Sequence, residues 1–348
     1  MGALICRGKQ ANMRIQKIVL FLVITSYFLG GCFTPGTAPI DWLSTSTITP
    51  PPFTITPTPL PTQTDTPTST ATLSETITPL PTDTPTPEPL VRFAVIGDYG
   101  SGNQNAKEVA DLVKSWIPDF IITTGDNNYP DGSASTIDHR IGQFYHEYIH
   151  PYKGVYGAGA EENRFFPCLG NHDWMTPGAE PYLDYFTLPG NERYYDFTWG
   201  TVHLFALNSD PNEPDGVGLS SRQAAWLREK LASSNAIWKI VYMHVPPYSS
   251  GYHGSIDWAV WPYKEWGATA VLSGHDHDYE RLIINGFPYF VNGLGGGAIY
   301  NFGTIIEGSK VRFNADYGAM LVVAGESELT FQFITRNGFL VDTFTINR

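Results

Sequence analysis

Two histidines one residue apart, His275 and His277, lie in the stretch LSGHDHDYERL at 272–282. If the apolar residues 270–272 form a strand, side chains two positions apart point the same way. The two imidazoles then converge while Asp276 faces elsewhere. A histidine pair of this kind also occurs on solvated loops, so its chemistry depends on what other donors the chain brings to it.

Further polar donors follow short apolar runs that resemble strands. Asp98 follows VRFAVIG, Asp126 and Tyr129 follow DFIITTG, Asn171 ends FFPCLGN, and His244 ends WKIVYMH. Ligands of open α/β sheets collect at the carboxyl ends of strands, so we expect these donors to meet. The candidate ligands are Asp98, Asp126, Tyr129, Asn171, His244, His275 and His277.

This donor set contains oxygen and imidazole nitrogen and no thiolate, which suits iron, zinc or manganese. The set is too large for one ion that must also leave room for a substrate. Two ions that share one carboxylate are the economical arrangement, and paired metals are a recurrent device for hydrolysing phosphoesters.

The elements that position these donors alternate between strand and helix. A strand is expected at 91–96, followed by a helix in 103–116 and a second strand before Gly125, which is the pattern of a βαβ unit with parallel strands. A second helix is expected within 220–234, where Ser220 and Gln223 fit a capping box. The pattern predicts an α/β domain.

Five blocks in the order GDYG, GDNNY, GNHD, VYMH and GHDH resemble the calcineurin-like metallophosphoesterases and, within them, the purple acid phosphatases of the tartrate-resistant type. The similarity runs from 93 to 277, extends into DYER, and includes the ending at 313–334. It implies a four-layer αββα sandwich of two mixed sheets, with the terminal strands at an edge. It also implies an acid phosphatase that releases inorganic phosphate from phosphomonoesters.

The resemblance also assigns roles to residues. Two metal sites share Asp126, and His172 and His253 lie near the substrate and the leaving group, where a histidinium protonates the departing alkoxide after a metal-bound hydroxide attacks phosphorus. Asp173 and Asp276 are expected to support the site or face solvent. The implied ligands are Asp98, Asp126, Tyr129 and His277 for the first ion, and Asp126, Asn171, His244 and His275 for the second.

Tyr129 bears on the charge of the first ion. Most relatives have Asp-x-His in the first block, whereas here Gly100 stands at the histidine position. Two divalent ions with two carboxylates and a hydroxide carry a net charge of about +1, and a phenolate would cancel it, which is unfavourable for a phosphate dianion. A trivalent first ion restores the charge. The sequence therefore predicts Fe(III) beside a divalent ion, which is iron, zinc or manganese.

The chain begins with features of export. Residues 1–31 combine a basic flank with an apolar run too short to span a bilayer comfortably, which is typical of a secretory signal starting at Met1 or Met13. The run ends in LGGC and resembles a lipoprotein signal, which implies lipid on Cys32. A Thr/Pro-rich stalk, 32–89, and a catalytic domain, 90–348, are expected to follow on the outer face of the membrane.

The net charge indicates which partners the chain is suited to bind, and the cysteine content indicates the state of Cys168. Without the four basic residues of the signal, 17 Lys+Arg face 34 Asp+Glu, so nucleic acid is an unfavourable partner. Small phosphoesters and inorganic phosphate fit better. Cys168 is left as a single thiol in an apolar run and is expected to be buried.

Two alternatives stay open at this point. A phosphodiesterase or nucleotide hydrolase would use the same metal ligands, because the motifs fix the chemistry and not the shape of the pocket. An inactive binding module displayed on a stalk belongs to another class. The absence of any substitution among the candidate ligands speaks against such a module.

Overall fold

The computed structural model of the chain describes residues 90–348. The predicted signal (1–31), the stalk (32–89) and the lipidation site Cys32 lie outside the described residues. Within 90–348, no helix has the length and apolar character needed to cross a membrane.

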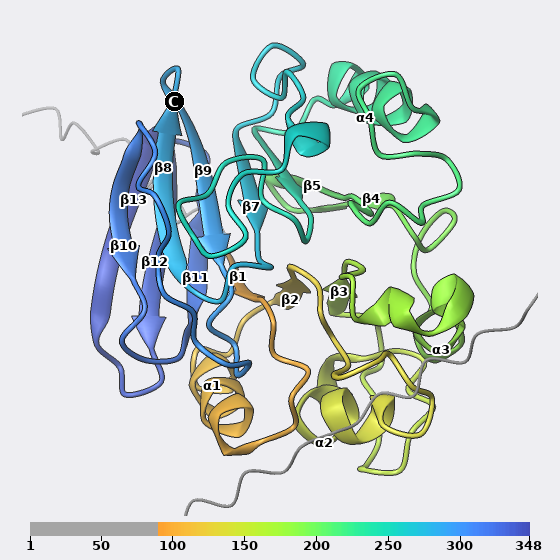
Figure 1. The fold of residues 1–348 in the computed structure, drawn as a ribbon. Coiled ribbons are helices and arrows are strands. Elements are labelled where there is room, and N and C mark those ends of the chain that lie inside the picture. Colours follow the sequence, from red (N-terminus) through yellow and green to blue (C-terminus); the bar gives the residue numbers. More distant parts are fainter. Residues whose placement is uncertain (1–89) are drawn as a thin grey trace, which may run out of the picture. The chain divides into compact units, whose positions relative to one another are not determined.

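In the described part of the chain, thirteen strands form two mixed sheets (Figure 1). Their bounds are β1 Val91–Ile96, β2 Phe120–Thr123, β3 Phe165–Pro167, β4 Tyr195–Trp199, β5 Val202–Ala206, β6 Trp238–Tyr242, β7 Ala270–Ser273, β8 Tyr279–Ile284, β9 Phe287–Asn292, β10 Ser309–Phe313, β11 Gly318–Ala324, β12 Glu328–Thr335 and β13 Leu340–Asn347. The six-stranded sheet has the order β13-β12-β11-β1-β2-β3, and the seven-stranded sheet has the order β10-β8-β9-β7-β6-β5-β4. Parallel pairing joins β1, β2 and β3 in one sheet and β5, β6 and β7 in the other.

Helices lie outside the sheets, so the predicted architecture of two mixed sheets with outer helices is confirmed. The helices are α1 Gln104–Ser115, α2 Gln143–Tyr145, α3 Glu180–Tyr185 and α4 Arg222–Ser233. Shorter turns are the π-helical η1 Asp138–Gly142 and the 3₁₀ turns η2 His146–Tyr148, η3 Asp173–Met175, η4 Pro177–Ala179 and η5 Asp257–Ala259.

The two long helices begin at side-chain caps. Asn103 caps α1 by accepting a hydrogen bond from the backbone N–H of Ala106 at 2.9 Å, and Ser221 caps α4 in the same way. The predicted capping box of Ser220 and Gln223 is therefore wrong by one residue. Gln223 instead exchanges hydrogen bonds with the backbone of Asn208.

The seven-stranded sheet is buried on both faces, which explains its continuous apolar runs. In β6, Ile240 and Tyr242 belong to a core shared with the six-stranded sheet, whereas Val241 packs into a second core together with Leu227 of α4. The hydroxyl of Tyr242 donates to the carbonyl of Phe166 in β3 at 3.2 Å and so links the two sheets directly.

The expectation that the terminal strands lie at an edge is wrong for most of that segment. β11 pairs with β1 in the interior of the six-stranded sheet and is almost entirely buried, because α1 packs over it. The edge is β13. Cys168 is a free, buried thiol, as predicted.

Candidate metal centre

The carboxyl ends of parallel strands from both sheets meet at one place. Asp98 and Asp126 follow β1 and β2 of the six-stranded sheet, whereas His244 and His275 follow β6 and β7 of the other. Two hydrogen bonds join these ends: His244 Nδ1 to the carbonyl of Thr124 at 2.8 Å, and the backbone N–H of His275 to Asp98 Oδ2 at 3.0 Å. All seven predicted ligands lie in the two groups that follow.

The first group consists of Asp98, Tyr129 and His277. The Tyr129 hydroxyl lies 3.3 Å from Asp98 Oδ1 and 3.0 Å from His277 Nε2, and His277 Nε2 lies 3.3 Å from Asp98 Oδ1. His277 Nδ1 bonds to the carbonyl of Ala298, which can only accept. Nε2 of the same ring is turned toward the two oxygens, and although burial acts in the opposite direction, the charge of Asp98 raises the pKa of His277.

The second group surrounds His244. Its Nε2 lies 2.9 Å from Asn171 Oδ1, 3.1 Å from His275 Nδ1 and 3.4 Å from Asp126 Oδ1. His244 Nδ1 donates to Thr124, which turns Nε2 toward these atoms, and although burial acts in the opposite direction, the charges of Asp126 and Asp98 raise the pKa of His244. Side chains that can coordinate a cation therefore face one another here.

Asp126 belongs to both groups. Besides its contact with His244, it offers a carboxylate oxygen that lies, together with donor atoms of Asp98 and His277, in a set spanning no more than 4.8 Å. Donor atoms around one ion at about 2.1 Å lie about 3 Å apart, which is the spacing within each group. The arrangement fits two cations that share Asp126.

Burial explains the protonation states that the site favours in the absence of a cation. Burial, followed by the charges of Asp126 and Asp98, raises the pKa of Tyr129 well above its usual value, so a phenolate here needs a nearby cation. Burial also raises the pKa of Asp98, against the opposing effect of His277. Burial and the neighbouring imidazole of His244 lower the pKa of His275 to about 2, so this ring is neutral and has a free lone pair.

The backbone around the site is tightly constrained. A Cβ on Gly100 would lie 2.3 Å from the backbone carbon of Asn127, so no histidine fits at this position. Asp98, Asp126 and His275 adopt left-handed φ values of 54°, 53° and 69°. His275 and His277 lie on a loop after β7 and not on the strand itself: His275 Nδ1 faces His244, whereas His277 Nε2 faces Tyr129 and Asp98.

Residues 91–279 match the family model described as calcineurin-like phosphoesterase. The chain belongs to this family. It is 28% identical over 245 residues to tartrate-resistant acid phosphatase type 5 of Mus musculus, covering 60% of this chain and 73% of that protein. It is 28% identical over 238 residues to purple acid phosphatase 17 of Arabidopsis thaliana, covering 59% and 68% of the two chains.

Among solved structures, this phosphoesterase resembles the purple acid phosphatase PPD1 from yellow lupin seeds. The TM-score is 0.61 at 18% identity, over 75% of this chain and 54% of the lupin chain. The prediction of a metal-dependent phosphoester hydrolase is confirmed at the level of the family and its homologues. The purple acid phosphatases use a dinuclear metal centre, for which the residues described above form a candidate ligand group.

The two histidines predicted near the substrate lie at the rim of the phosphoesterase centre. The backbone N–H of His172 donates to Asp126 Oδ1 at 3.0 Å, and its Nε2 lies 3.9 Å from Asp126 Oδ2. The exposed ring of His253 stacks on His275 with centroids 4.2 Å apart. Both imidazoles therefore lie beside ligand candidates, with a side open to solvent.

Asp173 and Asp276 support the surrounding loops. Asp173 is buried and accepts hydrogen bonds from Gly170 and Asn127. Asp276, between the two ligand candidates, accepts from the backbone N–H of His253 at 2.6 Å and of Gly254 at 3.2 Å, and from the Ser249 hydroxyl. Asp276 thus ties the loop that carries His253 to the loop that carries His275.

Two residues of the site were not identified from the sequence. Tyr300 stacks on His277, with centroids 4.1 Å apart and rings 4° from parallel. Asp210 follows β5, a strand outside the five sequence blocks, and the Ser209 hydroxyl before it accepts from the backbone N–H of Val245, the residue after His244. The alternating apolar run VHLFAL directly before Asn208 is the signal that identifies both β5 and this polar segment.

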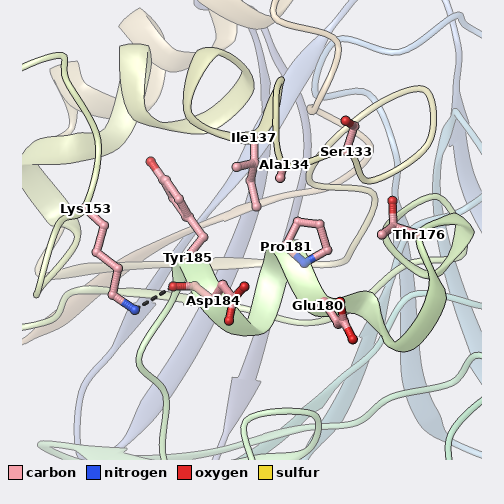
Figure 2. A pocket seen from close by; sticks show the side chains of 9 residues that line it. All are labelled: Ser133, Ala134, Ile137, Lys153, Thr176, Glu180, Pro181, Asp184 and Tyr185. Carbon is pink, nitrogen blue, oxygen red and sulfur yellow. Dashed lines mark hydrogen bonds between the residues drawn. The ribbon is translucent and has the colours of Figure 1, made fainter.

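A separate pocket of about 440 Å³ lies between the 133–137 segment and α3 (Figure 2). Ile137 and Pro181 form part of its lining, and Lys153 donates to the backbone carbonyl of Asp184 at 2.6 Å across it. None of its nine lining residues is a predicted ligand, so this pocket is distinct from the metal centre.

Proposed function

We propose that this phosphoesterase is an acid phosphatase that releases inorganic phosphate from small phosphomonoesters. One observation carries the proposal: two groups of lone-pair donors face one another at about hydrogen-bonding distance and share Asp126. The tartrate-resistant acid phosphatase of the mouse, to which the chain is similar, supports the choice of a monoester.

The proposed ligands are those that the resemblance assigns. Asp98, Tyr129 and His277 hold one ion, Asn171, His244 and His275 hold the other, and Asp126 holds both. The crowding at Gly100 and the contacts of Tyr129 support a phenolate in place of a histidine, and hence Fe(III) beside divalent iron, zinc or manganese. When bound, the pair supplies Lewis acidity that lowers the pKa of water and neutralises phosphate charge.

The histidines of the chain handle the phosphate and the proton. His172, fixed through its backbone to Asp126, orients the phosphoryl group at the edge of the second group. His253 lies over His275 with its ring open to solvent, where it gives a proton to the departing alkoxide. Asp276 holds His253 in place through the backbone of its loop.

Metal analysis and a panel of esters test the proposal together. The purified chain is expected to contain two metal ions, at least one of them iron, and to hydrolyse alkyl and aryl phosphomonoesters faster than diesters. Faster turnover of diesters or nucleotides would instead make it a phosphodiesterase. Bound metal with no turnover of any ester would indicate a binding module.

Localisation on the outer face of the cell membrane is a further part of the proposal. The LGGC sequence at Cys32 and the Thr/Pro-rich 32–89 segment support a lipid anchor and a spacer. The variant Cys32→Ser is expected to be unprocessed or released from membranes. A wild-type chain that is fully soluble outside the cell, with a different amino terminus, would contradict the anchor. The acidic balance supports small phosphoesters as partners over nucleic acid.

A further inference from the structure

Asp210 is a carboxylate beside the metal centre to which the proposed reaction gives no task. It follows β5, which is parallel to β6, so both strands end at the same edge of the sheet. The Ser209 hydroxyl accepts from the backbone N–H of Val245 at 3.0 Å, which ties this segment to the residue after His244. Asp210 is 7% exposed.

Within residues 90–348, only one of the two oxygens of the Asp210 carboxylate accepts hydrogen bonds. Asn212 donates to Oδ1 from its backbone and from its side chain, both at 2.8 Å. Within residues 90–348 no donor is bonded to Oδ2, and this atom is not sealed from solvent. Burial raises the pKa of Asp210, and the two hydrogen bonds from Asn212 act against this rise.

Two indoles are hydrogen-bonded to the segment that leads into Asp210. Trp258 donates from Nε1 to the carbonyl of Ser209 at 3.2 Å, and its side chain is 41% exposed. Trp174 donates from Nε1 to Asn208 Oδ1 at 3.2 Å, and the same oxygen accepts from the backbone N–H of Asp210. Both rings are therefore fixed to the residues directly before Asp210.

We propose that Asp210, with Trp174 and Trp258, binds an ammonium group on the alcohol part of the substrate. The substrate class is then the phosphomonoesters of amino alcohols, with quaternary ammonium favoured, and this inference rests on the proposed function. A carboxylate beside the site repels a phosphate dianion that brings no positive charge, and aromatic faces attract a weakly hydrated cation. The same group thus disfavours neutral leaving groups and favours cationic ones.

The reaction itself is ordinary hydrolysis. Water adds to phosphorus, the P–O bond to the alcohol breaks, the alcohol oxygen takes up a proton, and the products are inorganic phosphate and the free amino alcohol. Asp210 and the indoles touch only the ammonium group, so they affect which ester is selected and not the bonds that change.

Two esters of the same shape test the inference. Phosphocholine and 3,3-dimethylbutyl phosphate differ in one atom, a cationic nitrogen against a neutral carbon. The metal-loaded full chain is expected to prefer phosphocholine in kcat/KM by about tenfold or more, the scale of a partly desolvated cation–aromatic contact. Asp210→Asn keeps an oxygen for Asn212 and is expected to bring this ratio close to one, and Trp258→Leu to lower it.

Asp257→Asn is the matched control, because it removes the same charge from an exposed position next to Trp258. This variant is expected to keep the preference. A wild-type ratio near one while nitrophenyl phosphate is turned over would overturn the inference and leave the proposed function standing. An unchanged ratio in Asp210→Asn, or an equal loss on all three esters, would also overturn it.

Calorimetry with choline provides a second readout that needs no turnover. Wild-type protein is expected to bind choline more tightly than 3,3-dimethylbutanol, and Asp210→Asn to lose the difference. If no ester is hydrolysed but this difference is present, the proposed function fails and the cation site stands. If no ester is hydrolysed and choline binds no more tightly than 3,3-dimethylbutanol, both proposals fail.

Discussion

Replacing Asp276 by Asn should separate His253, the histidine proposed to donate the proton, from the candidate metal centre without removing either. The carboxylate accepts from the backbone N–H of His253 and Gly254 and from the hydroxyl of Ser249. An amide offers one oxygen and turns its NH₂ group toward at least one of these donors. The loop at 249–254 is then held beside His275 by fewer hydrogen bonds.

The size of the effect follows from the hydrogen bonds. A buried N–H left without an acceptor costs about 1–3 kcal/mol, and every 1.4 kcal/mol corresponds to about tenfold in a population. The fraction of molecules with His253 in position should fall by roughly 5- to 150-fold. The rate on an alkyl phosphate should fall by a similar factor, within the limit of about 10²–10⁴ set by general-acid catalysis.

The assay compares kcat for an alkyl phosphate and for nitrophenyl phosphate, with metal content measured on the same samples. Nitrophenolate is a weak base that leaves without a proton, so its ester should lose far less. In the double variant with His253→Ala, the alkyl rate should be no lower than in His253→Ala alone. The matched control is Asp278→Asn, a neighbouring buried carboxylate without hydrogen bonds to the 249–254 loop. Equal losses on both esters, or additive losses in the double variant, would refute this role of Asp276.

Four further outcomes are expected. Tyr129→Phe should lose the visible absorption of an iron phenolate, and an unchanged spectrum would remove the case for it. Asp126→Asn should lower both metal ions together in elemental analysis, whereas loss of one ion would show that Asp126 does not bridge. Burial, followed by the charges of Asp276 and Glu280, raises the pKa of Asp278 to about 8, so folding stability should fall as pH rises from about 4 to about 8. Urea unfolding should then show a larger gain for Asp278→Asn at pH 8 than at pH 5, and an equal gain would contradict this. Reductant should leave the melting temperature of the domain unchanged, because Cys168 is a free thiol, and a shift would contradict that.

The strand ends were predictable from the sequence, and the turns that follow them were not. Apolar runs before Asp98 and Asp126 predict both strands and the place where they end, because burial on both faces leaves a strong pattern. The left-handed backbone of His275 leaves none, so the strand-like alternation expected for His275 and His277 does not continue there, and the two rings face different groups. Gln223 was misassigned because its partner, Asn208, is distant in sequence.

Residues outside the motifs were the hardest to place. Asp210 has a turn-forming environment in the sequence, DPNEPDG, which gives no reason to expect that its segment is tied to the one that follows His244. Its position depends on the parallel pairing of β5 with β6 and on the hydrogen bond from Val245 to Ser209. Tyr300 follows a run of glycines and reaches the site only because its backbone N–H bonds to the carbonyl of His277.

The candidate ligands are divided between the two sheets, so the preference for one metal over another depends on how the two sheets pack together. The six-stranded half brings only oxygen, from Asp98, Asp126, Tyr129 and Asn171, and every imidazole ligand comes from the seven-stranded half. Carboxylate and carbonyl oxygen alone are the ligands of Mg²⁺ and Ca²⁺, and imidazole is what shifts a site toward iron and zinc. Selectivity among the elements is therefore encoded in the docking of two halves of the chain. Whatever loosens their contact at this end would change which ion is preferred as well as how tightly it is held.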